Sequence, residues 1–242
     1  MSIDPSVALH AAGRRDAAGA GARQGCVLVA GAVGWLGEAL LSDVLARGGH
    51  RDVVALADGD ATMSLGVRGL SLAPLHALPP LDAVVVAQSD PDVPGARSFH
   101  GRDAPFALVD TASMYRTAAA AAAAGARRLV LVHPLPVWQQ LSALHLGLSG
   151  EAELRIAQLP FDSVAVLRPL AQGSGAAGGW LQRVANVYLS LQFLMVPRSL
   201  PTLTSAQIAR VAVDLLTHPE PGVRILGAAQ IAERVGARAR VR

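Results

Sequence analysis

Residues 25–37 read GCVLVAGAVGWLG, and this stretch decides the fold. The apolar run before Gly31 predicts a buried strand, and the residues after it predict a helix through Arg47, where two glycines end it. Glycines stand at positions 31, 34 and 37. That spacing is typical of a turn between a strand and a helix that holds a dinucleotide.

Each glycine has a physical reason to be there. Gly31 allows a tight turn, Gly34 lets the backbone approach a pyrophosphate, and Gly37 permits close contact between helix and strand. The free N–H groups and partial positive charge of the helix N-terminus favour an anion at this point. We expect the whole turn to bind the cofactor: Gly31, Ala32, Val33, Gly34, Trp35, Leu36 and Gly37. The alternative is a turn that keeps the glycines and holds nothing.

Composition narrows the class of protein. The 242 residues suffice for one large domain with a full core, and 52% hydrophobic with 4% aromatic residues predict a core of Ala, Val and Leu. The net charge is +3, and all 21 basic residues are arginine. They are scattered, without an aromatic-interleaved basic stripe, which argues against nucleic acid as a partner.

The single cysteine, Cys26, excludes an intramolecular disulfide and a multi-cysteine metal site. The histidines lack metal-ligand spacing, so we expect no metal. Residues 1–24 read as a disordered leader without a signal peptide, and the apolar segment 188–196 is too short to span a bilayer. These features predict a cytoplasmic protein with no membrane partner.

Strands and helices alternate along the rest of the chain. Further strands are expected at 52–57, 67–72, 82–87, 128–133 and 163–168, and helices from Pro105 to Gly125 and over 144–159. Because each crossover must return over one face, the pattern predicts an α/β fold with a doubly wound, Rossmann-like parallel sheet.

The pattern changes beyond residue 172. A Gly/Ala-rich loop (173–179) precedes an apolar helix (181–191), a capping-box helix from Thr204 to Thr217, a strand at 223–226 and a last helix from Ala228. We expect a Rossmann domain over 25–235 that includes a small C-terminal helical cap from about 173, then a basic tail over 236–242. The segment 188–196 is a candidate homodimer surface.

Four blocks resemble a known family: GAVGWLG at 31–37, DAVVVA at 82–87, AAAAGARRLVLV at 121–132 and GEAELRIAQLPFDSVAVLRPL at 150–170. In order and spacing, within residues 25–230, the chain resembles atypical short-chain dehydrogenases/reductases of the NAD(P)-binding group related to nucleoside-diphosphate-sugar epimerases. The resemblance implies a dinucleotide cofactor, NAD or NADP, whose pyrophosphate lies on the glycine turn.

The resemblance also places the two halves of the cofactor. The end of the second strand, Ala57 and Asp58, would select the cofactor, because a carboxylate accepts hydrogen bonds from ribose hydroxyls and repels a 2′-phosphate. Asp58 thus favours NAD, with a solvated loop aspartate as the alternative. On the adenosine side we expect Ala87, Gln88 and Ser89, and near the nicotinamide His133 and Pro134.

The family's catalytic groups are missing from their expected positions. Relatives use a Tyr-x-x-x-Lys pair and a serine, whereas this chain places His145 and Ser149 at the pair and His133 in the serine region. The chain has no lysine at all. His145 is a candidate for proton transfer, a surface histidine being the alternative.

Other charged residues lie near these positions. Arg168 is expected to anchor its strand end or to shape the cofactor pocket. Glu151 and Glu153, two residues apart on a helix, should point to different faces and not form a catalytic pair.

Three functions stay open at this point. The first is an NAD(P)(H)-binding protein without the standard chemistry, in which the cofactor is a structural element, a redox sensor or part of a partner-dependent regulator. The second is an active oxidoreductase or epimerase that transfers its proton through His145 or a substrate group. The third is an assembly subunit that no longer depends on a dinucleotide. Besides the cofactor we expect a small molecule or a protein as a partner, and the sequence does not identify it.

Overall fold

The structure is a computed structural model that describes residues 24–47, 49–60, 62–64, 69–89, 98–99, 102–103, 106–135, 150–171 and 203–239. Its strands are β1 (Gln24–Ala30), β2 (His50–Leu56), β3 (Met63–Ser64), β4 (Leu70–Ala73), β5 (Ala83–Ala87), β6 (Ser98–Phe99), β7 (Arg102–Asp103), β8 (Arg128–Val132), β9 (Ser163–Arg168) and β10 (Gly222–Gly227). Its helices are α2 (Gly34–Arg47), α3 (Thr111–Ala123), α5 (Glu151–Ala157), α7 (Ser205–Thr217) and α8 (Ala228–Ala239), with a 3-10 turn at Leu75–Ala77.

Eight of the described strands form one sheet in the order β10-β9-β8-β5-β1-β2-β4-β3. All neighbours pair in parallel except β3, which runs antiparallel along β4. The chain moves outward from β1 in one direction through β2 and β4, and then in the other from β5 to β10. The expected doubly wound parallel sheet is confirmed, with the reversal of strand order between β1 and β5.

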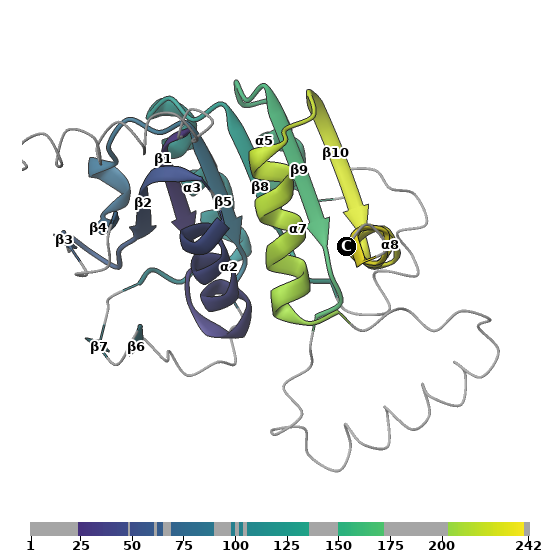
Figure 1. Cartoon of the computed structure of the whole chain (residues 1–242). Helices are drawn as coiled ribbons and strands as arrows, with labels where there is room; N and C mark the ends of the chain where they lie inside the picture. Colours follow the sequence, from purple (N-terminus) through teal and green to yellow (C-terminus); the bar gives the residue numbers. More distant parts are fainter. Residues whose placement is uncertain are drawn as a thin grey trace, which may run out of the picture.

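Helices cover both faces of this sheet (Figure 1), with α2 and α7 on one side and α3 and α5 on the other. Each layer has its own apolar core: residues such as Leu40 and Ile208 pack on one face, and Met114 and Ile156 on the other. All five residues of β5 are buried, as expected for a strand covered on both faces.

The C-terminal part of the chain extends the sheet. β10 pairs with β9 over the whole of its length, and α7 packs beside α2 (Figure 1). Helix α8 continues to Ala239, into the segment expected as a tail. Residues 172–202, which include the predicted loop at 173–179, the helix at 181–191 and the segment 188–196, lie outside the described residues, so a cap formed by them stays a prediction.

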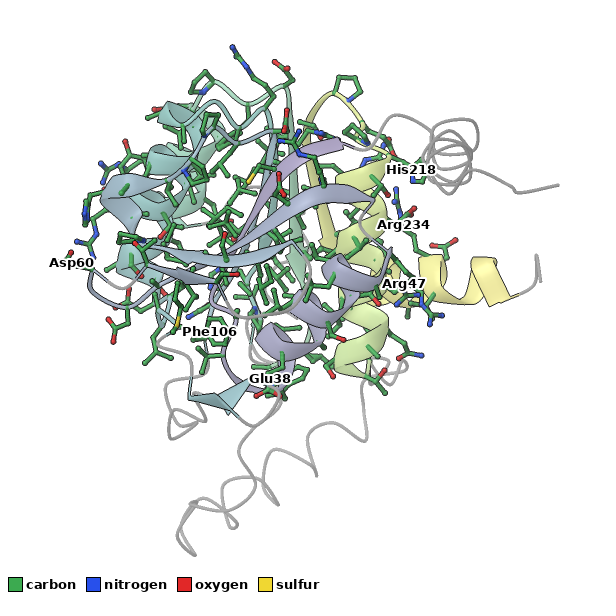
Figure 2. The ribbon with its side chains drawn as sticks, turned by 60° about the vertical axis from the view of Figure 1, so that its left-hand side comes forward. Glu38, Arg47, Asp60, Phe106, His218 and Arg234 are labelled. Atoms are coloured by element: carbon green, nitrogen blue, oxygen red, sulfur yellow. The ribbon has the colours of Figure 1, made fainter. Side chains whose placement is uncertain are left out.

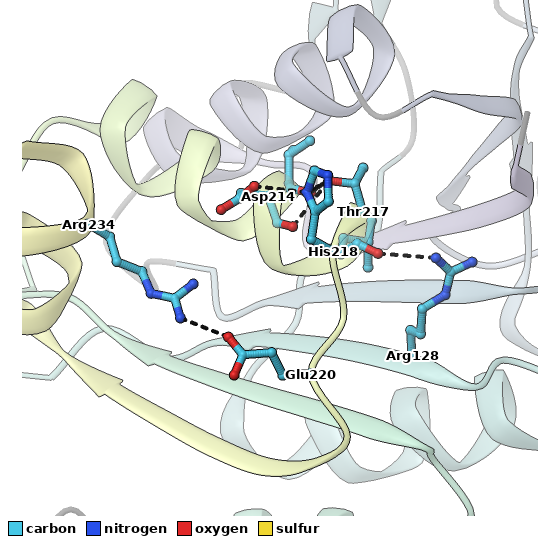
Figure 3. Close-up of polar contacts among 8 residues, drawn as sticks. Arg128, Asp214, Thr217, His218, Glu220 and Arg234 are labelled. Carbon is cyan, nitrogen blue, oxygen red and sulfur yellow. Dashed lines mark hydrogen bonds and ion pairs between the residues drawn. The ribbon is translucent and has the colours of Figure 1, made fainter. Parts of the chain in front are cut away.

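The end of α7 is tied to its neighbours by polar contacts (Figure 3). The guanidinium of Arg128, at the start of β8, donates a hydrogen bond of 3.2 Å to the carbonyl of Leu216 in the last turn of α7. The hydroxyl of Thr217 donates to the carbonyl of Val213 at 2.9 Å, and Glu220 pairs with Arg234 of α8 at 3.1 Å. The first contact satisfies a carbonyl in the last turn of α7 and joins this helix to β8. The ion pair joins the segment after α7 to α8.

The start of one expected helix shifts. The helix predicted from Pro105 begins at Thr111 instead, because Asp110 accepts a hydrogen bond from the Ser113 N–H (2.7 Å) and caps it. Phe106 before it forms an antiparallel bridge with Ala57. Between β5 and α3 lies the short antiparallel β6–β7 ladder.

The N-terminal leader, apart from Gln24 in β1, lies outside the described residues. Within the part of the chain that the structure describes, no helix has the length and apolar character needed to cross a membrane.

Candidate functional site

The glycine turn lies where the strand order reverses, between the carboxyl ends of β1 and β5. Gly31 has a φ of +75°, and a Cβ built on it would come within 2.0 Å of the carbonyl oxygen of Ala87 at the end of β5. A Cβ on Gly37 would come within 2.1 Å of the carbonyl oxygen of Gly31. Gly34 also has a φ of +75°. Side chains are therefore excluded at the first and third glycines by close backbone approach. The sequence predicted close contact at Gly37 and a tight turn at Gly31, but not the approach of Gly31 to Ala87.

The other residues of the turn divide by burial. Ala32, Val33 and Leu36 have side chains inside the core, at most 4% exposed, and Trp35 packs against it from its edge. Ala32, Val33 and Leu36 would therefore offer a ligand their backbone and not their side chains. The first turn of α2 carries no acidic residue, so no carboxylate of its own neutralises the positive end of the helix dipole.

The end of β5 supplies polar groups next to this turn. The side-chain N–H of Gln88 donates to the Thr111 hydroxyl at 3.2 Å, while its buried Oε1 has no hydrogen-bond partner among the described residues. A buried acceptor without a partner costs free energy, and a ligand hydroxyl could satisfy it.

Ser89 holds the segment that precedes α3. Its N–H donates to the carbonyl of Val109 at 2.8 Å, and its Oγ accepts from the Val109 N–H at 3.0 Å. The N–H of Ala107 in turn donates to the carbonyl of Leu56 at 2.9 Å. The segment 106–109 therefore joins the ends of β2 and β5. Figure 2 shows Phe106 on the same side of the molecule as Glu38 near the start of α2, with His218 at the other end.

Asp58 follows directly after Ala57, which continues β2. It is exposed at the carboxyl end of this strand, the position from which the resemblance expects it to read the ribose.

His133 and Pro134 come directly after β8, the strand beside β5. The Nδ1 of His133 lies 3.1 Å from Oε1 of Glu153 in the first turn of α5. Its side chain is 18% exposed, whereas those of Glu153 and Arg168 are 2% exposed. His133 is thus the member of this group that is open to solvent.

Arg168, the last residue of β9, pairs with the same carboxylate. Its Nε donates to Oε1 of Glu153 at 3.3 Å and its Nη2 donates to Oε2. Burial alone would raise the pKa of Glu153, but hydrogen bonds from His133 and Arg168 and the charge of Arg168 outweigh it and lower that pKa to about 2. The carboxylate is therefore ionised at neutral pH.

This cluster was not predicted from the sequence. His133 was expected near the site and Arg168 at a strand end, but Glu153 was considered only as half of a carboxylate pair with Glu151. The available signal was Arg168 itself, because a charged residue directly at the end of the apolar run SVAVLR (163–168) needs a partner where it is buried. His145 and Ser149 lie outside the described residues. No group of three or more potential metal ligands occurs among the described side chains.

No protein-family model matches the chain, and no curated protein matches it. Among solved structures, it is similar to a Rossmann-fold NAD(P)-binding family protein from Shigella flexneri, with 12% identity and a TM-score of 0.47 over 85% of this chain and 92% of that one. It is also similar to chuY from E. coli, with 15% identity and a TM-score of 0.47 over 84% and 95% of the two chains. A third match is the enzyme WbmG of Bordetella bronchiseptica in complex with NAD, with 15% identity and a TM-score of 0.43 over 90% of each chain. These matches are distant, and the assignment of the fold rests on the strand order and pairing described above.

Proposed function

We propose that this protein binds a dinucleotide, NAD(H) in preference to NADP(H), at the carboxyl edge of its sheet. The observation that carries the proposal is the glycine turn pressed against the end of β5. There the Cβ of any other residue at Gly31 would meet the Ala87 carbonyl at 2.0 Å. This arrangement brings backbone N–H groups and the start of α2 to the point where open α/β sheets bind ligands.

Several residues would hold the two halves of the cofactor. The turn over 31–37 would bind the pyrophosphate through its backbone, and the unsatisfied Oε1 of Gln88 would accept a hydrogen bond from a cofactor hydroxyl. Ala87 and Ser89 would line the adenosine side, and His133 and Pro134 the nicotinamide side. When bound, the nicotinamide would supply a site that accepts or donates hydride.

The cofactor preference would come from Asp58. A carboxylate at the end of β2 accepts hydrogen bonds from both ribose hydroxyls and repels a 2′-phosphate. Because the tyrosine–lysine pair is missing, a binding or regulatory role for the bound cofactor fits the chain better than the standard reductase chemistry.

Calorimetry on the full chain with NAD⁺, NADH, NADP⁺ and NADPH tests the proposal. We expect NAD(H) to bind more tightly than NADP(H). Failure of all four to bind would overturn the proposal and favour an assembly subunit that keeps the fold alone.

Substitution of Asp58 tests the preference separately. Asp58→Arg should move the preference toward NADP(H), since arginine attracts the 2′-phosphate. Asp60→Arg is the matched control, because it makes the same charge change two residues along the chain at a side chain that is 92% exposed. An equal shift in both variants would remove Asp58 from the site and leave only a general effect of charge.

An active oxidoreductase is the second candidate function. It is favoured by one observation, the contact between His133 and a buried ionised carboxylate at the edge of the same site.

A further inference from the structure

The cluster of His133, Glu153 and Arg168 is built from three separate elements. Arg168 ends β9, Glu153 lies in the first turn of α5, and His133 follows β8. Two of the three side chains are almost completely buried, and burying charges is costly unless they pair with good geometry. The two-point contact between Arg168 and Glu153 meets this condition and fixes the carboxylate in place.

The fixed carboxylate determines how the ring of His133 is protonated. An ionised carboxylate can only accept hydrogen bonds, so the Nδ1 that lies 3.1 Å from Glu153 must carry a hydrogen and donate it. In the neutral ring the second nitrogen, Nε2, then has a free lone pair. Among the described residues no hydrogen bond to Nε2 is found.

The position of the His133 ring brings this lone pair to the side of the proposed cofactor site. His133 is at the carboxyl end of β8, next to β5, whose end contacts the glycine turn. A dinucleotide whose pyrophosphate lies on that turn has one half on each side of the point, between β1 and β5, where the strand order reverses. The half on the β5–β8 side would lie toward His133.

We propose that His133 is the proton-transfer group of this site, acting on a secondary alcohol or the corresponding ketone, with Glu153 and Arg168 as positioning residues. The inference rests on the proposed dinucleotide binding and goes beyond it, because it gives the chain a chemical step without tyrosine or lysine.

The step at His133 is a proton transfer. The O–H bond of the bound alcohol breaks, a bond from Nε2 to that proton forms, and the positive charge of the imidazolium lies beside the Glu153 carboxylate. A nicotinamide cofactor, when bound, would supply the acceptor for the two electrons that leave the alcohol carbon as hydride. In the direction of reduction, protonated His133 returns the proton to the carbonyl oxygen.

The first test needs no ligand. Proton–nitrogen correlation spectra of the ring nitrogens, recorded on the full chain at neutral pH and assigned with His133→Gln, report which nitrogen carries the hydrogen. We expect a hydrogen on Nδ1, facing the Glu153 carboxylate. A ring that carries its hydrogen on Nε2 and none on Nδ1 would overturn the proposal.

The positioning role is tested in the same spectra. Glu153→Gln replaces the carboxylate by a weaker acceptor of similar size, so part of the His133 population should move its hydrogen to Nε2. If that variant does not fold, the double variant Glu153→Leu/Arg168→Leu removes both buried charges and should have the same effect. An unchanged ring would show that Glu153 does not position it.

The second test measures turnover of NADH with two ketone probes, cyclohexanone and phenanthrenequinone. We expect His133→Gln to lower kcat by about a hundredfold or more, a much larger factor than its effect on the Kd of NADH. His218→Gln is the matched control, because its Nδ1 also lies 3.1 Å from a carboxylate, that of Asp214, on an exposed helix end (Figure 3).

The outcomes separate the two proposals. If NADH does not bind in calorimetry, the proposed function fails, while the ring spectra still decide the orientation of His133. If NADH binds but neither probe is reduced, or His133→Gln keeps the full kcat, only the inference about His133 is overturned.

Discussion

Gly31 illustrates how one residue sets the geometry of the site. Its positive φ is strained for any residue with a side chain, and the Ala87 carbonyl occupies the space of a Cβ. We expect Gly31→Ala to lower the free energy of unfolding by about 3 kcal/mol or more, since strain and overlap with a backbone atom add together. Urea denaturation of the full chain measures this loss.

Gly49 provides the control for that prediction. It has a similar φ of +67°, but nothing lies within 4 Å of the position that a Cβ would take there. Gly49→Ala should therefore cost only the backbone strain, about 1 kcal/mol. Equal losses of unfolding free energy in Gly31→Ala and Gly49→Ala would mean that the close approach of Gly31 to β5 adds nothing to the cost of the substitution.

The half-buried Cys26 shows how burial and charge act on a single group. Burial, together with the charges of Asp52 and Asp82, raises the pKa of its thiol to about 11. The raised pKa makes this thiol a poor nucleophile at neutral pH, because only the thiolate is an effective nucleophile.

At the scale of elements, a substitution at Asp110 tests the corrected start of α3. Asp110 caps the helix, so Asp110→Ala should lower the free energy of unfolding by about 1 kcal/mol. If the helix began at Pro105, Asp110 would lie inside it, and alanine would stabilise the protein by a few tenths of a kcal/mol. Thermal or urea denaturation gives the sign, and Asp110→Ser, which keeps a capping oxygen, should remain close to the wild type.

The buried pair between α5 and β9 makes a second prediction at this scale. Glu153→Leu leaves Arg168 buried without its carboxylate and should cost about 3–5 kcal/mol. The double variant Glu153→Leu/Arg168→Leu should recover part of that loss, because it removes both buried charges. A double variant less stable than the single one would show that Arg168 stabilises the fold mainly through its other contacts.

Local signals in the sequence predicted elements well, and contacts between distant segments were harder to predict. The apolar run 163–168 became β9 without a shift, and the box at Thr204 and Gln207 caps α7 as expected, since both signals lie within a few neighbouring residues. The start of α3 was wrong because Phe106 pairs with Ala57, a residue far away in the sequence. Proline at 105 suggested a helix start that this long-range pairing prevents.

The same reasoning applies to the candidate site. The glycine turn was predictable because its three positions are defined by spacing within one βα unit. The contact of Glu153 with His133 and Arg168 joins residues 20 and 15 positions apart on three elements. Such a cluster follows only from the register of β8 and β9 and the placement of α5.

At the scale of the whole molecule, the two ends of the sheet have different roles. The carboxyl end carries the glycine turn, Gln88 and His133, which form the candidate site. The amino end carries contacts that hold elements together, such as that of Arg128 with the end of α7 (Figure 3). His50, at the start of β2, belongs to this second end, and both of its ring nitrogens are buried without a partner among the described residues.

His50 makes the stability of the whole molecule depend on pH. Burial, helped by the nearby charge of Arg128, lowers the pKa of His50 from 6.5 to about 4. Between these values the unfolded chain binds more protons than the folded one, so stability falls as pH falls from 6.5 to 4. Because the ring is only half-buried and partly screened by solvent, we expect a loss of about 1–2 kcal/mol.

Glu153 acts in a lower window. Its pKa is lowered to about 2 from an ordinary value of 4.5. Its contribution to the free energy of unfolding is therefore fully present above the ordinary value and is lost as pH falls from there toward 2.

Urea denaturation at a series of pH values should resolve the pH ranges in which His50 and Glu153 act. His50→Gln should make the free energy of unfolding less dependent on pH in the upper range. In the same range His76→Gln, the matched variant at an exposed histidine, should lose stability as the wild type does. If His50→Gln loses stability with pH as steeply as the wild type above about pH 4.5, another group causes the loss and His50 is not held neutral by its burial.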